Sequence, residues 1–118
     1  MKDIAQEQLD LGMKTATSQV NRLVKKEQMT QEQANQVLAT IEPTLEYEGF
    51  DKVDGVIEAV VENLGLKHKV LDQLEAVVRK DTLIATNTSS LRIDDIGQHM
   101  KHPERFVGMH FFNPVPVM

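Results

Sequence analysis

Residues 53–61 read Val-Asp-Gly-Val-Ile-Glu-Ala-Val-Val, and the apolar residues of this stretch follow one another with little alternation. A short apolar run of this kind is typical of a parallel strand that is covered on both faces. Asn63 and Gly65 then mark a turn, and residues 66–80 carry apolar side chains at helical spacing. The stretch therefore predicts a buried strand that leads into a helix.

The residues that follow repeat this alternation of strand and helix. Residues 82–86, Thr-Leu-Ile-Ala-Thr, predict a second short buried strand, and residues 106–112 predict a third. Between them, a polar turn at residues 87–90 precedes a short helix through Ile93 and Ile96. Strands that alternate with helices in this way indicate right-handed βαβ units and a parallel sheet.

Two helices are predicted ahead of the first strand. Residues 7–26 place apolar side chains at three- and four-residue steps, which is the spacing of an amphipathic helix. Thr30 then begins a second helix, with Gln33 placed to complete a capping box. We therefore expect a helical arm over about residues 5–41 and a βαβ core over about residues 51–118.

The composition is that of an ordinary globular protein: 41% of the 118 residues are hydrophobic and 26% are charged. A net charge of -5 argues against a general nucleic-acid binder. The absence of cysteine excludes disulfides and thiolate metal sites, and the four histidines lack metal-ligand spacing, so no metal is expected. No apolar run has membrane-spanning length and the first residues do not resemble a signal peptide, so we expect a cytoplasmic protein.

Polar side chains gather where each predicted strand ends. Glu62 and Asn63 follow the first strand, residues 87–90 follow the second, and His110 and Asn113 lie at the end of the third. Ligands of open α/β sheets bind beyond the carboxyl ends of the strands. The sequence therefore predicts a site there that combines carboxylate, hydroxyl, imidazole and amide groups.

Each of these groups also has a purely structural interpretation. Residues 87–90 could be a loop that caps the next helix, and Glu62 could be a carboxylate at a helix start. His110, between Met109 and Phe111, could be a core histidine with a satisfied ring. Solvated surface positions are expected for His68, His99, His102, Lys25 and Lys26.

Three motifs together resemble the 3-hydroxyacyl-CoA dehydrogenases. They are Glu58-Ala-Val-Val-Glu62-Asn63, Asn87-Thr-Ser-Ser-Leu91 and Gly108-Met-His-Phe-Phe-Asn-Pro-Val115. The resemblance covers essentially the whole chain and is strongest from Asp51 onward. The first residues and the helical arm look most like the dehydrogenase part of bacterial multifunctional fatty-acid oxidation proteins, in which an enoyl-CoA hydratase domain comes first.

This resemblance implies an oxidoreductase of fatty-acid beta-oxidation. The reaction of the family is oxidation of (S)-3-hydroxyacyl-CoA to 3-ketoacyl-CoA, with NAD as the hydride acceptor. The implied fold is a partial Rossmann-type, doubly wound parallel sheet. The implied partners are the acyl-CoA substrate, other subunits of an oligomeric parent protein, and a thiolase subunit.

The resemblance also assigns roles to individual residues. His110 matches the catalytic base, which takes the hydroxyl proton as hydride leaves the same carbon. Ser89 matches a catalytic serine that bonds the substrate oxygen close to the nicotinamide. Positions that match cofactor contacts are Asp3, Ala59, Glu62, Lys67, Ser89 and Asn113. Positions that match substrate contacts are Ser89, Asn113 and, on the CoA phosphates, Lys26.

The sequence departs from the family pattern because it contains no Gly-x-Gly-x-x-Gly motif. The resemblance implies that this pyrophosphate-binding turn and the first strand lie before Met1. It also implies that the glutamate that orients the histidine lies about a dozen residues after His110, beyond the last residue. We therefore expect a fragment that has little or no activity by itself.

Two other interpretations stay open. One is a fragment of a short-chain 3-hydroxybutyryl-CoA dehydrogenase, because the helical domain that shapes the acyl pocket in the family is not part of this sequence. The other is a non-catalytic, Rossmann-like binding module. Ser89, His110 and Asn113 argue against the second interpretation, since a module that only binds has no need of a base beside a hydroxyl.

Overall fold

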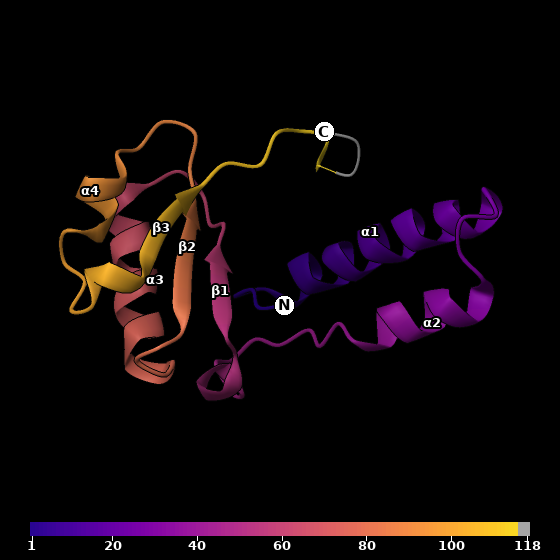
Figure 1. The fold of residues 1–118 in the computed structure, drawn as a ribbon, viewed down its shortest axis with the longest axis horizontal. Coiled ribbons are helices and arrows are strands. Elements are labelled where there is room, and N and C mark those ends of the chain that lie inside the picture. Colours follow the sequence, from indigo (N-terminus) through magenta and orange to yellow (C-terminus); the bar gives the residue numbers. More distant parts are fainter. Residues whose placement is uncertain (116–118) are drawn as a thin grey trace. The chain divides into compact units, whose positions relative to one another are not determined.

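A computed structural model describes residues 1–115 of the chain (Figure 1). The chain divides into two compact units, of which the first is Met1–Glu48 and the second begins at Gly49. The first unit is helical, and the second is a parallel sheet with its connecting helices. None of the described helices is long and apolar enough to cross a membrane.

The first unit is a pair of helices, α1 (Gln6–Lys25) and α2 (Gln31–Ala39), which pack against each other (Figure 1). The Thr30 hydroxyl accepts a hydrogen bond from the Gln33 backbone N–H, and the Gln33 side chain accepts one from the Thr30 N–H. This reciprocal pair is the predicted capping box. The apolar side chains buried in this unit are Leu9, Val20 and Ala34.

The second unit is built on three parallel strands in the spatial order β1-β2-β3. The strands are β1 (Gly55–Glu58), β2 (Leu83–Asn87) and β3 (Phe106–Met109). At their carboxyl ends Glu58 is paired with Thr86, and Asn87 with Met109. The predicted α/β arrangement is therefore confirmed, with sequential strands as neighbours in the sheet.

Both helical crossovers, α3 (Leu64–Val77) and α4 (Ile93–Gly97), cover the same face of this sheet (Figure 1). Lys67 of α3 bonds Glu58, and Gly97 of α4 lies against the ring of Phe106. A Cβ atom at Gly97 would lie 2.9 Å from that ring, so the close approach of α4 to β3 needs a glycine there. The buried apolar side chains of this unit are Leu71, Leu74, Val78, Ile84, Ala85, Ile96 and Met100.

The prediction that the first strand is covered on both faces is wrong for the described residues. Ile57 is 53% exposed and Leu83 is 51% exposed, although both lie in the sheet. Side chains alternate between the two faces of a strand, and α3 and α4 both pack on the face that carries Glu58. The opposite face therefore keeps apolar side chains at the surface.

The strands are also shorter than the predicted stretches 53–61 and 106–112. After β1, the Val60 N–H donates to the Glu58 carboxylate at 2.7 Å instead of to a neighbouring strand. After β3, the Phe111 N–H donates to the Asn87 side chain at 3.1 Å. Side-chain acceptors thus replace the ladder at both strand ends, and this ends the sheet there.

The amino ends of β2 and β3 are held by a buried arginine. The Arg105 guanidinium donates to the carbonyl groups of Arg79 and Thr82 and forms an ion pair with Glu75 at 3.5 Å. Two short 3-10 helices, η1 (Phe50–Lys52) and η2 (Pro103–Arg105), lie before β1 and β3.

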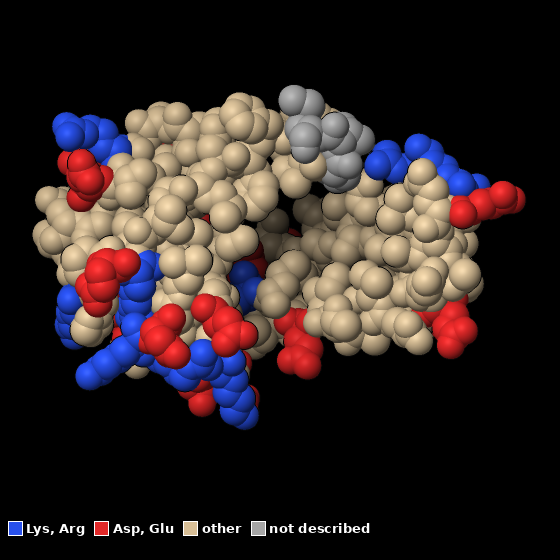
Figure 2. Space-filling view, in the orientation of Figure 1, with Lys and Arg blue, Asp and Glu red and all other residues tan. Residues whose placement is uncertain are grey.

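Charges of both signs are interspersed on the face of the molecule that Figure 2 shows. In the second unit, for example, Arg79 bonds Asp54 at 3.1 Å and Asp81 at 3.0 Å. A mixed surface of this kind does not favour the continuous positive potential that attracts a nucleic-acid backbone.

Candidate functional site

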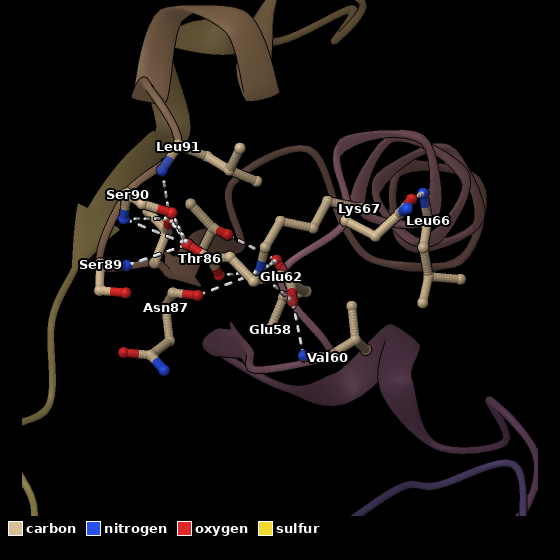
Figure 3. Close-up of polar contacts among 12 residues, drawn as sticks. Glu58, Val60, Glu62, Leu66, Lys67, Thr86, Asn87, Ser89, Ser90 and Leu91 are labelled. Carbon is tan, nitrogen blue, oxygen red and sulfur yellow. Dashed lines mark hydrogen bonds and ion pairs between the residues drawn. The ribbon is translucent and has the colours of Figure 1, made fainter.

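A buried polar cluster joins the carboxyl ends of β1 and β2 (Figure 3). The Lys67 ammonium donates to both Glu58 oxygens, at 2.9 and 3.1 Å, and to the Asn87 carbonyl oxygen at 3.0 Å. The Thr86 hydroxyl donates to the second Glu58 oxygen, and the Val60 N–H donates to the first. Because burial of a charge is costly unless the charge is paired, this full set of bonds offsets the cost of enclosing both charges.

Glu62 lies beyond the end of β1, and its carboxylate reaches the turn that follows β2. One oxygen accepts from the Thr88 hydroxyl, from the backbone N–H groups of Ser89 (3.1 Å) and Ser90 (3.2 Å), and from the Ser90 hydroxyl (3.2 Å). The other oxygen lies 3.9 Å from the Lys67 ammonium. The carboxylate therefore holds the whole turn by contacts that span 26 to 28 residues of sequence.

Hydrogen bonding by the Thr88 hydroxyl, reinforced by Ser90 and Ser89, lowers the pKa of the Glu62 carboxyl to about 2. Donors that point at a carboxylate stabilise its charged form, and here they outweigh the opposing effect of partial desolvation. Glu62 is therefore a fixed negative charge at neutral pH.

These contacts overturn the interpretation of residues 87–90 as a helix cap. Residues 87–90 do not cap α4, because its N-cap is Arg92, whose side chain makes no capping bond. The residue that caps α3 is Asn63, which accepts from the Leu66 N–H at 2.9 Å, and Glu62 directly precedes it. The turn at residues 88–90 and the Glu62 carboxylate form hydrogen bonds with each other.

The Ser89 side chain is exposed, and Figure 3 shows no interaction between its hydroxyl and the other residues drawn. Only its backbone N–H takes part in the turn network among the described residues. The hydroxyl is thus left available at the edge of the sheet, as a residue that contacts a ligand requires.

His110 follows the last residue of β3 and is exposed, so the interpretation as a core histidine is wrong. Its ring packs on the ring of Phe112 with centroids 4.5 Å apart. Asn87 and Met109 are register partners, and the Thr88 N–H also donates to the Met109 carbonyl at 3.2 Å. Since His110 comes directly after Met109 and Ser89 directly after Thr88, the two predicted catalytic residues leave adjacent strands at the same edge.

The remaining predicted residues lie in several places. Ala59 is exposed directly after β1, and Asn113 is exposed before Pro114. Asp3 and Lys26 belong to the first unit. One Asp3 oxygen accepts the backbone N–H groups of residues 4 and 5, at 2.7 and 3.1 Å, and Lys26 is the exposed C-cap of α1.

The other histidines are not simply solvated. A ring nitrogen of His68 lies 2.8 Å from the Asp95 carbonyl oxygen, and its ring packs edge-on against His99 at 4.7 Å. His102 lies 3.2 Å from a Glu104 oxygen. Among the described residues no group of His, Asp or Glu side chains has the arrangement of a metal site.

Sequence reasoning missed the roles of Glu58 and Asn87. A signal for Glu58 was present, because a carboxylate within an apolar strand needs a buried partner. The bond from the Phe111 N–H to the Asn87 side chain had no such signal, because it depends on the register of β2 and β3.

Comparison with known proteins connects this geometry to a family. Residues 1–118 match the family described as "3-hydroxyacyl-CoA dehydrogenase, NAD binding domain". The chain is similar to fatty acid oxidation complex subunit alpha from a Psychrobacter species, with 48% identity over 98% of the chain. The same subunit from Acinetobacter baumannii is 49% identical over 100% of the chain. The chain spans 16% of the length of each of these curated relatives.

Solved structures are similar over nearly the same length. A (S)-3-hydroxybutyryl-CoA dehydrogenase from Ralstonia eutropha has a TM-score of 0.94 and 42% identity, over 100% of this chain and 42% of that one. A 3-hydroxybutyryl-CoA dehydrogenase from Escherichia coli has a TM-score of 0.93 and 37% identity, over 99% of this chain and 25% of that one.

Proposed function

Because the chain belongs to the 3-hydroxyacyl-CoA dehydrogenase family, as part of its NAD-binding domain, we propose that the protein oxidises (S)-3-hydroxyacyl-CoA to 3-ketoacyl-CoA with NAD. The observation that carries the proposal is that Ser89 and His110 follow the paired carboxyl ends of β2 and β3, at the same edge of the sheet. A hydroxyl and an imidazole at one sheet edge can bond and deprotonate a secondary alcohol.

The residues present fit a dinucleotide. One Asp3 oxygen is bound to backbone N–H groups, and the second has no hydrogen-bond partner among the described residues, so it is available to ribose hydroxyls. Val61, two residues after Ala59, is 70% exposed and offers apolar surface beyond β1. NAD, when bound, supplies the hydride acceptor. In this proposal Asp3, Ala59, Glu62, Ser89 and Asn113 contact it.

In the proposed reaction the imidazole of His110 takes the proton of the substrate 3-hydroxyl while the hydride leaves the same carbon. The Ser89 hydroxyl donates a hydrogen bond to the substrate oxygen and so orients it. Asn113 and Lys26 contact the substrate, the latter at the CoA phosphates. Lys67 was expected to contact the cofactor. Its ammonium is enclosed and lies 3.9 Å from the nearer oxygen of Glu62, which supports a contribution to cofactor binding through Glu62.

The relatives named fatty acid oxidation complex subunit alpha support a role in fatty-acid beta-oxidation. We propose that the protein acts as part of such a multifunctional subunit, in an oligomer with a thiolase subunit, in the cytoplasm.

The experiment that tests the function measures NADH formation by the protein in its full natural length. The (S)-3-hydroxyacyl-CoA substrate is compared with its (R) enantiomer as the matched control. We expect NADH from the (S) form only. Equal absence of NADH with both enantiomers, from a folded protein that binds NAD, would contradict the proposal.

A short-chain specificity is a second candidate, because two similar solved structures are 3-hydroxybutyryl-CoA dehydrogenases. A series of substrates from four carbons upward separates the candidates: kcat/KM that falls steeply after four carbons favours this second one. Titration of NAD and acetoacetyl-CoA against the wild type and His110→Ala separates both from a module that only binds.

The 118 residues alone are expected to form little NADH, because they contain no Gly-x-Gly-x-x-Gly turn to hold the pyrophosphate. A direct comparison of this chain with the protein of full natural length, at equal concentration, tests that expectation. A rate near that of the longer protein would contradict it.

A further inference from the structure

Asn87 connects three elements at the carboxyl edge of the sheet. It is the last residue of β2, and its carbonyl oxygen accepts a hydrogen bond from Lys67 of α3 at 3.0 Å. Its side-chain oxygen accepts one from the backbone N–H of Phe111 at 3.1 Å. One half-buried residue thus joins a helix to the segment that follows β3.

The bond to Phe111 acts on the backbone of His110. The ladder ends at Met109, so the chain beyond it is no longer aligned by strand pairing. The peptide unit between His110 and Phe111 is planar, and a partner for its N–H fixes the orientation of the whole unit. This limits the backbone rotation at His110 and with it the direction in which the imidazole leaves the chain.

The backbone of Asn87 is itself held at a defined place. The Lys67 ammonium that bonds its carbonyl is fully enclosed and is fixed in turn by both oxygens of Glu58. A functional group keeps a defined position when packing and further hydrogen bonds restrict the residues that support it. Buried charges on β1 and α3 therefore hold the backbone from which the Asn87 side chain reaches the Phe111 N–H.

We propose that Asn87 is a positioning residue for His110, which holds the histidine in a reactive direction without touching it. This inference rests on the proposed function, in which His110 is the base. The chemical group required at position 87 is a hydrogen-bond acceptor of the size of an amide oxygen.

Kinetics of two nearly isosteric variants test the proposal in the protein of full natural length. Asn87→Leu removes the acceptor, and we expect kcat at saturating NAD and (S)-3-hydroxybutyryl-CoA to fall by about 10- to 100-fold. KM for the substrate should change by less than about threefold, because binding contacts remain. Asn87→Asp keeps the acceptor oxygen and should restore kcat to within about threefold of wild type. Asn87→Ala replaces Asn87→Leu if the latter does not fold.

Thr82→Val is the matched structural control. The Thr82 hydroxyl is buried before the opposite end of β2 and donates to the Val53 carbonyl at 3.0 Å. The variant loses one hydrogen bond of the same strand region, and its kcat should stay within about twofold of wild type. A fall in kcat as large as that of Asn87→Leu would show that loss of stability alone causes the effect, and it would overturn the proposal.

Amide hydrogen exchange at Phe111, measured without substrate, gives a readout that is independent of activity. Exchange should be faster in Asn87→Leu than in wild type, and no faster in Asn87→Asp, since a carboxylate accepts more strongly. Unchanged exchange in Asn87→Leu, or unchanged kcat, overturns the inference. A wild type that forms no NADH contradicts the proposed function and the catalytic part of the inference, whereas the exchange result still decides whether Asn87 holds the segment.

Discussion

The ammonium of Lys67 lies 2.9 Å from one carboxylate oxygen of Glu58 and 3.1 Å from the other, and both side chains are fully enclosed. The pair links α3 to the end of β1, and the Asn87 carbonyl extends it to the end of β2. The pair thus adds a buried ionic link to the backbone ladder at the carboxyl ends of β1 and β2.

Removal of one partner of this pair is expected to destabilise the protein strongly. Lys67→Met leaves the Glu58 carboxylate buried without its counter-ion, and we expect a loss of about 3–5 kcal/mol of unfolding free energy. The double variant Glu58→Gln/Lys67→Met should recover much of that loss because no charge stays buried. Denaturant titration of the two single variants and the double variant measures the coupling. Strictly additive losses would contradict the prediction.

Glu62 makes the stability depend on pH in acid. Its folded pKa, lowered to about 2 chiefly by the Thr88 hydroxyl, lies below the ordinary value of 4.5. A lowered carboxyl pKa means that the contribution to stability is complete above pH 4.5 and is lost as the pH falls toward 2. The difference in unfolding free energy between wild type and Glu62→Gln should therefore shrink over that interval. Parallel pH profiles for the two proteins would show that Glu62 is not responsible.

His110→Ala should lower kcat by about 10²- to 10⁴-fold, the usual effect of a missing general base. The affinity for NAD should stay the same, because the ring is exposed and packs on Phe112. His99→Ala is the control, since His99 is exposed and its ring packs on His68 of α3. Steady-state kinetics and NAD titration decide the point. Retention of full kcat in His110→Ala would exclude the histidine as the base.

Two adjacent serines should respond differently to the same substitution. The Ser89 side chain is exposed and its hydroxyl makes no contact drawn in Figure 3, so Ser89→Ala should change the unfolding free energy by less than about 0.5 kcal/mol while it lowers kcat/KM. The Ser90 hydroxyl donates to Glu62 at 3.2 Å, so Ser90→Ala should cost about 0.5–1.5 kcal/mol. Thermal or chemical denaturation and kinetics are compared for both variants. The prediction fails if Ser90→Ala, and not Ser89→Ala, selectively impairs turnover.

Local patterns were sufficient to predict the elements. The spacing of apolar residues located α1 and α3, and the pair Thr30 and Gln33 predicted a capping box that forms as expected. The predicted strands were longer than the observed ones. Beyond the observed ends, the backbone N–H groups bond the side chains of Glu58 and Asn87, and a local pattern does not reveal such acceptors. The burial of β1 was overestimated, since the face on which a crossover packs depends on the other strands.

The sequence by itself determined the order of strands and helices and the types of residue at each strand end, because both follow from periodicity and from side-chain chemistry along neighbouring positions. Only the tertiary structure decided which of those groups meet. Glu62 binds a turn 26 residues away, Lys67 is enclosed beside Glu58, and Asn87 bonds the backbone beside His110. These three contacts depend on strand register and helix packing, which bring together residues that are far apart in the chain.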